Sequence, residues 1–111
     1  MPHYIPQQGD LISVTFDPQS GHEQRGRRPA LVVSHTEFNQ HTGLAIVCPL
    51  TSKDRGFPFH VAVLNQPEVT GFVMVEQVKS IDFRAHEARP IGRSTGELLD
   101  EVLSILDACI Y

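Results

Sequence analysis

Tryptophan is absent from this sequence, and the chain holds only two cysteines, two methionines and two tyrosines. No apolar run approaches the roughly 20 residues that a membrane-spanning helix requires, and residues 1–8 lack the basic and then apolar pattern of a signal peptide. We therefore expect a cytoplasmic protein with no membrane association. Two cysteines do not make a disulfide framework, so we expect Cys48 and Cys109 to be reduced thiols in the core. The six histidines show no HExxH or other ligand spacing, which predicts no metal site.

Composition and charge place the chain among globular proteins. It is 41% hydrophobic and 20% charged, and a length of 111 residues predicts a single domain that spans residues 1–111. The net charge is −4, but residues 94–111 carry four acidic side chains and no basic one, so the rest of the chain is neutral. A neutral body argues against stable binding of duplex DNA. Selective binding of a short single strand remains compatible with it.

Residues 21–28 concentrate chemically useful side chains. This segment holds an imidazole, a carboxylate, an amide and three guanidinium groups, from His22, Glu23, Gln24, Arg25, Arg27 and Arg28. An apolar run follows at 29–34, so the segment is predicted to be a loop that enters a buried central strand. An excess of positive charge in an acidic protein indicates an anionic ligand.

Short strands and one terminal helix make up the predicted secondary structure. Apolar alternation and turn residues predict strands at 10–16, 29–34, 44–50, 58–64 and 71–79, with a short final strand at 88–93. Pro29 is expected at the first position of its strand, and Pro49 is expected to break strand pairing. Ser94 and Glu97 form a capping box before an amphipathic helix. The fold class is therefore mainly β with helical cover (α+β): a small antiparallel barrel with a C-terminal amphipathic helix.

Several short motifs, taken in order, resemble the signature of the MazF/PemK (Kid) toxin family. They are Gly9-Asp10, Phe16-Asp17-Pro18, Gly21-His22-Glu23-Gln24, Arg28-Pro29-Ala30, Pro49-Leu50-Thr51-Ser52, Gly56-Phe57-Pro58-Phe59 and Glu76-Gln77-Val78-Lys79-Ser80-Ile81-Asp82. The resemblance implies a metal-independent endoribonuclease of a bacterial toxin–antitoxin module, with the SH3-like barrel of the MazF/PemK/CcdB superfamily. It also implies a homodimer without a cofactor, and an antitoxin whose disordered acidic segment covers the active groove.

Metal-free RNA cleavage uses the ribose 2′-hydroxyl as the nucleophile on its own phosphate. It requires a base, a cation or donors for the developing negative charge, and an acid for the leaving oxygen. Arg28 is the candidate cation because a guanidinium matches phosphate geometry, and the resemblance implies that Arg28 and Thr51 are catalytic. Thr51 is assigned a hydrogen bond to a phosphate oxygen. Glu23 is the favoured base, and His22 is the alternative, since its pKa suits proton transfer in either direction.

Other residues are candidates for binding the substrate. In the Kid-like branch of the family, an acidic residue at the Glu76 position acts with the histidine and with an arginine where this chain has Met74, so Glu76 is a third candidate base. Amides read base edges, lysine binds phosphate and aromatic rings stack on bases. The candidate contact residues are Phe16, Gln24, Ser52, Glu76, Gln77 and Lys79. Phe57 and Phe59 are alternative stacking residues, although Phe59 is expected in the core.

Two non-enzymatic functions remain open at this point. The first is a CcdB-like toxin that binds DNA gyrase through its C-terminal surface, and the second is a small β-barrel that binds RNA without cutting it. Both leave the combination of Arg28, Thr51 and the Glu23 loop without a purpose. A sequence-specific endoribonuclease acting on single-stranded RNA, and thereby arresting translation, is therefore the principal hypothesis.

Overall fold

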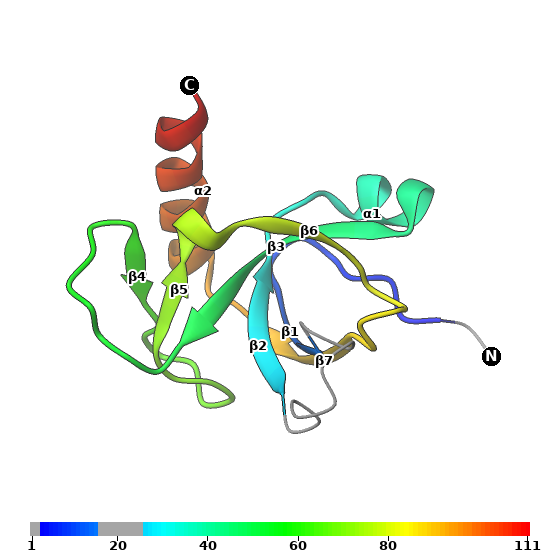
Figure 1. Ribbon diagram of the computed structural model, residues 1–111, viewed down its shortest axis with the longest axis horizontal. Coiled ribbons are helices and arrows are strands. Elements are labelled where there is room, and N and C mark those ends of the chain that lie inside the picture. The colour runs from blue at the N-terminus through cyan, green and yellow to red at the C-terminus, as the bar shows by residue number, and fades with distance from the viewer. Residues whose placement is uncertain (1–2, 16–25) are drawn as a thin grey trace.

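Seven short strands and two helices make up most of the computed structural model, which describes residues 3–15 and 26–111 (Figure 1). In chain order the elements are β1 (Asp10–Thr15), β2 (Arg27–Val32), α1 (Thr36–Thr42), β3 (Leu44–Thr51), β4 (His60–Ala62), β5 (Phe72–Met74), the 3₁₀ turn η1 (Val75–Gln77), β6 (Lys79–Asp82), β7 (Arg89–Arg93) and α2 (Gly96–Ile110). No helix in the described ranges is long and apolar enough to cross a membrane.

Strand β3 is the centre of the sheet. The strand order is β4-β5-β3-β2-β1-β7, and β6 also pairs with β3. One edge of β3 pairs with β2, while the other edge pairs with β6 over Leu44–Val47 and then with β5 over Leu50–Thr51. All of these pairings are antiparallel, and the change of partner along β3 turns the sheet into an open barrel, which confirms the predicted fold class.

Two apolar clusters stabilise the two sides of this sheet. The larger one includes Leu31, Leu50 and Val73 and is covered by α2 through the buried residues Leu98 and Val102. The smaller one includes Ile12, Val32, Val47 and Phe83, with Tyr4 and Ile5 packed against it. Burial of an alternating strand face on each side accounts for the strand pattern that the sequence shows.

The segment 71–79 is two strands and not one, so this prediction was wrong. Strand β5 ends at Met74, η1 follows, and β6 begins at Lys79. Pro49 supplies the physical reason. In the pairing of β2 with β3 it lies opposite Ala30, and Val33 donates to Ile46 at 2.9 Å, so alternation makes Ala30 and Pro49 a non-hydrogen-bonded pair. The nitrogen of Pro49 then faces the β5/β6 edge with no N–H to donate, and the opposing chain breaks there.

The amphipathic helix is present, but its first turn and its last turn differ from expectation. Thr95, not Ser94, is the N-cap: its side chain accepts the backbone N–H of Leu98 at 3.1 Å. At the other end α2 projects beyond the sheet (Figure 1), and Ile110 is 65% exposed. Cys109 is consequently exposed and only Cys48 is buried, so the prediction of two core thiols was wrong for Cys109.

Candidate active site

The ends of β2 and β3 separate at a cavity of about 400 Å³. The ladder between these strands stops at Ala30 opposite Pro49, although both strands continue. The next hydrogen-bonded pair of this ladder would join residues 29 and 50, and Pro29 has no N–H for it. Pro29 is the third residue of β2, not the first as predicted. The two strand ends are therefore free of each other, and the cavity is lined by Arg28, Pro29, Leu50, Thr51, Ser52, Lys53, Arg55 and Thr70.

Arg28 and Thr51 line this opening from the two strand ends. Each lies two residues beyond the last pair of the ladder, Ala30 with Pro49, and therefore on the same face of its strand as that pair. Arg28 is exposed, and its side chain makes no hydrogen bond or ion pair with any residue that the structure describes. Its guanidinium is thus available to a ligand. The structure brings together the two residues that the sequence analysis assigned to catalysis from distant segments.

Arg27, the neighbouring residue, is held by the protein itself. Its guanidinium donates to Ser13 Oγ at 3.0 Å, to the Ser13 carbonyl at 2.8 Å and to the Glu87 carbonyl at 2.5 Å. It also lies 3.6 Å from the Glu87 carboxylate. These contacts join β2 to β1 and to the turn before β7. Since consecutive residues of a strand point to opposite faces, anchoring Arg27 directs Arg28 toward the cavity.

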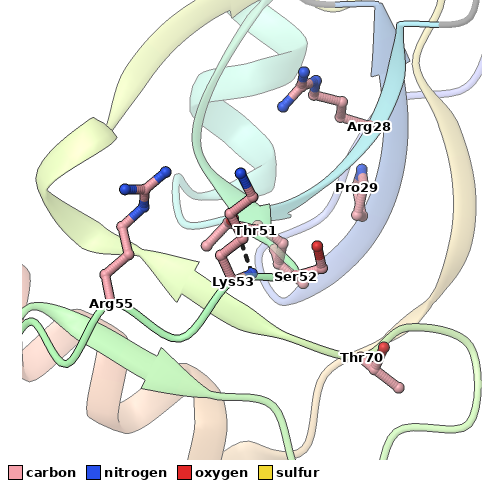
Figure 2. A pocket seen from close by; sticks show the side chains of 8 residues that line it. Arg28, Pro29, Thr51, Ser52, Lys53, Arg55 and Thr70 are labelled. Atoms are coloured by element: carbon pink, nitrogen blue, oxygen red, sulfur yellow. Dashed lines mark hydrogen bonds between the residues drawn. The ribbon is translucent and has the colours of Figure 1, made fainter.

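The Thr51 hydroxyl is oriented by the loop that follows it. Its Oγ1 accepts the backbone N–H of Lys53 at 3.2 Å, drawn as a dashed line in Figure 2. One lone pair is used in this way, so the hydroxyl proton remains available for donation to a ligand. Gly71 packs against the same residue: a Cβ at this position would lie 2.2 Å from the Thr51 carbonyl oxygen, and Gly71 has a φ of +116°. Only glycine allows this approach.

Lys53 and Arg55 were not among the predicted site residues, yet both line the cavity. In Figure 2 the charged ends of Arg28 and Arg55 lie on either side of Thr51 and Lys53. The lining described for this cavity contains three cationic side chains and no carboxylate. Such a surface fits a polyanion. The sequence feature that could have indicated them is the pair of basic residues soon after the Thr51 and Ser52 hydroxyls. Ser52 is exposed and also lines the cavity.

Four predicted residues cannot be placed: Phe16, His22, Glu23 and Gln24 lie outside the described residues. Three others are described but do not line the cavity. Glu76 and Gln77 belong to η1, and Lys79 begins β6 opposite Val47. Glu76 and Gln77 are therefore not strand residues, because η1 interrupts the strand that was predicted at 71–79. Phe59 is also not a core residue, since it is 43% exposed.

Glu76 is paired with a histidine that the sequence analysis did not select. His60 Nε2 lies 2.9 Å from Glu76 Oε2. Partial burial raises the pKa of Glu76. This effect is outweighed by the hydrogen bond from His60, by hydrogen bonds from the Glu76 backbone and from Gln77, and by the charge of His60, so the pKa is lowered overall. A carboxylate with a lowered pKa is a poor proton acceptor near neutral pH. Glu76 therefore suits a role as a hydrogen-bond acceptor better than that of a general base.

Comparison with known proteins decides the family. Residues 7–110 match the family described as PemK-like, MazF-like toxin of type II toxin–antitoxin system. The chain belongs to this toxin family. It is 41% identical over 107 residues to the endoribonuclease toxin MazF of Escherichia coli K12, covering 96% of both chains. It is 40% identical over 112 residues to the endoribonuclease toxin ChpB of the same strain, covering 94% of this chain and 93% of ChpB.

Solved structures of family members have the same fold. MazF of Deinococcus radiodurans superposes with a TM-score of 0.86 at 39% identity, covering 97% of this chain and 98% of that one. The MazF chain of a MazE–MazF complex from the same organism gives a TM-score of 0.86 at 33% identity, with 97% of each chain covered. Family membership thus agrees with the resemblance seen in the sequence motifs.

Among the described residues, no group of three or more His, Cys, Asp or Glu side chains is arranged to hold a metal ion.

Proposed function

We propose that this chain is an endoribonuclease toxin of a toxin–antitoxin module, acting as a single domain over residues 1–111. It cleaves single-stranded RNA at specific sequences without a metal ion and thereby arrests translation. The observation that carries this proposal is the cavity that Arg28 and Thr51 line together, with no carboxylate in the described lining. The relatives named endoribonuclease support the assignment of the reaction class.

The reaction is an internal transesterification. The ribose 2′-oxygen attacks the adjacent phosphorus while its proton passes to a base, and the bond from phosphorus to the 5′-oxygen breaks. That oxygen takes up a proton and leaves as a 5′-hydroxyl, while the other product ends in a 2′,3′-cyclic phosphate. Arg28 stabilises the negative charge on the phosphorane oxygens, and the Thr51 hydroxyl donates a hydrogen bond to one of them. Glu23 is our preferred base, with His22 as the alternative.

The remaining cations bind the strand beside the cleaved linkage. Lys53 and Arg55 are exposed and lie in the loop that continues from Thr51. We assign them to phosphates that flank the reacting one, since such contacts position a strand without reading its sequence. Ser52 supports Thr51, while Gln24, Gln77 and Lys79 contact the substrate elsewhere, with Phe16 stacking on a base.

We propose two protein partners for this chain. Structures of MazF with MazE support a cognate antitoxin as one partner, and we propose that its acidic segment occupies the cationic cavity. The second partner is another copy of this chain: a chain of 111 residues has a high ratio of surface to volume and gains core on association. We place this homodimer in the cytoplasm. Sedimentation at micromolar protein concentration tests the dimer.

The function is tested by cutting a mixed-sequence single-stranded RNA in the presence of EDTA. We expect cleavage at a few short sequences, with 2′,3′-cyclic phosphate and 5′-hydroxyl ends. Thr51→Val preserves the shape of the side chain and removes the hydroxyl, so it should lower the rate about 100-fold. Arg84→Ala serves as a control, because it removes one exposed positive charge from the turn after β6. It should cut at the wild-type rate.

Other outcomes would replace the proposal. RNA that is bound but never shortened would indicate a binding module, and inhibition of gyrase supercoiling without RNA cleavage would indicate a CcdB-like toxin. Cleavage that requires Mg²⁺, or products with 3′-hydroxyl ends, would contradict the mechanism.

A further inference from the structure

His60 and Glu76 form a polar pair to which the proposed cleavage reaction assigns no step. The side chain of His60 is 3% exposed and that of Glu76 is 30% exposed, and their hydrogen bond is 2.9 Å long. Because the Glu76 carboxylate accepts this bond, Nε2 carries a proton in both the charged and the neutral imidazole. In the neutral form the other ring nitrogen, Nδ1, is an acceptor.

Nδ1 of His60 is buried and has no hydrogen-bond partner among the residues that the structure describes. Buried polar atoms in native proteins are nearly always paired, because an unpaired one destabilises the fold. Here the pairing partner Glu76 keeps the imidazole in the orientation and tautomer that leave Nδ1 unpaired. A group held in this way is prepared to bind something that donates a hydrogen bond.

The position of this nitrogen relative to Thr51 follows from the strand register. Thr51 lies opposite Phe72, which lies opposite Ala62, and the pair of Met74 with His60 lies two residues further along the strands. The row between them, formed by Leu50, Val73 and Val61, is in the core cluster, so Thr51 and His60 share the opposite face of the sheet. From strand spacing and rise per residue, the Cα atoms of Thr51 and His60 are about 12 Å apart. His60 is thus within reach of a nucleotide near the one whose phosphate meets Thr51.

An exposed aromatic ring covers the imidazole. The ring of Phe57 lies 5.1 Å from that of His60 at an angle of 54°, and Phe57 is 51% exposed. The chain that reaches Phe57 is the loop that carries Lys53 and Arg55 past the cavity. Cations that follow the phosphates, with an aromatic ring beside them for a base, are the usual components of a single-strand binding surface.

We propose that Phe57, His60 and Glu76 form a subsite for one unpaired nucleobase next to the cleaved linkage. The Phe57 ring turns aside and stacks on the base, and an N–H on the edge of the base donates to His60 Nδ1. Glu76 is a positioning residue that holds the imidazole for this contact. The subsite rests on the proposed function for its ligand, an RNA strand, and gives the enzyme selectivity at one flanking position.

The test uses the full-length protein and oligoribonucleotides with a single cleavage site, in which each flanking position carries each of the four bases in turn. His60→Gln keeps a donor for Glu76 and removes Nδ1, and Phe57→Leu removes the stacking ring. At one flanking position we expect His60→Gln to lower the preference in kcat/KM between the best and the worst base about tenfold, which corresponds to about 1.4 kcal/mol. Phe57→Leu should raise KM more than it lowers kcat. His41→Gln, at an exposed histidine of α1, is the matched control and should change neither.

Binding of the same oligonucleotides with 2′-deoxyribose at the cleavage site separates this proposal from the proposed function. Base-selective binding that depends on His60 and Phe57 supports the subsite even if the wild-type protein cuts no RNA. The subsite is overturned if His60→Gln and Phe57→Leu retain the full base preference. It is also overturned if they lose activity equally with every base, or if the wild-type protein binds all bases alike or binds no RNA.

Discussion

The adjacent residues Arg27 and Arg28 should respond to mutation in opposite ways. The Arg28 side chain is exposed and contacts no described residue by a hydrogen bond or ion pair, so Arg28→Ala removes an interaction that forms only with the substrate. A cation that stabilises a phosphoryl transition state is typically worth about 10³-fold in rate, or about 4 kcal/mol. We therefore expect Arg28→Ala to lower kcat/KM about 1,000-fold while its melting temperature changes by less than about 2 °C. Arg28→Lys should be intermediate, since lysine supplies the charge without the bidentate geometry.

Arg27→Ala should mainly affect stability. Arg27 makes three hydrogen bonds and is 25% exposed. At roughly 1 kcal/mol for each hydrogen bond, reduced for solvent exposure, the loss is about 2 kcal/mol. A chain of this length has an unfolding entropy near 0.23 kcal/mol/K by the usual value per residue, so the melting temperature should fall by about 9 °C.

Both variants are measured by thermal unfolding followed by circular dichroism and by single-turnover cleavage at 25 °C, where both should be folded. The reasoning is refuted if Arg28→Ala melts as early as Arg27→Ala. It is equally refuted if folded Arg27→Ala loses activity as completely as Arg28→Ala, because anchoring and catalysis would then not be divided between the two residues.

Three further predictions concern residues around the site. Glu76 has a lowered pKa in the folded protein, so it stabilises the fold above its unfolded-state pKa and loses that contribution as the pH falls through its folded-state pKa. In Glu76→Gln, the free energy of unfolding should therefore decrease less steeply as the pH is lowered, which denaturant unfolding at a series of acidic pH values measures. Gly71→Ala should lower both stability and cleavage rate, because the new Cβ collides with the Thr51 carbonyl, and wild-type cleavage in this variant would contradict that contact. Burial raises the pKa of Cys48 to about 12, so a thiol reagent should titrate Cys109 alone in the native protein and both thiols in denaturant.

Local patterns were sufficient for most of the elements. Apolar alternation located the strands, and the amphipathic stripe located α2 to within its cap. The errors occurred where local rules permit two solutions. Ser94 and Thr95 are both good caps, and packing of Leu98 and Val102 against the sheet accompanies the choice of Thr95. Similarly, the apolar run at 71–79 reads as one strand, and only its partner β3 shows that the pairing breaks at Pro49.

Motifs and periodicity are local properties, so they were sufficient to indicate the family and the fold class and to predict Arg28 and Thr51 as site residues. Which groups meet depends on the tertiary structure. It brings Arg28 and Thr51 to one cavity, holds Arg27 against Ser13 and Glu87, and adds Lys53 and Arg55 to the cavity lining. It also pairs His60 with Glu76. The physical reason is that strand register depends on which backbone N–H groups find partners across the sheet. Pro29, which has no N–H, sets where β2 separates from β3, and Pro49 sets where β3 changes its partner from β6 to β5.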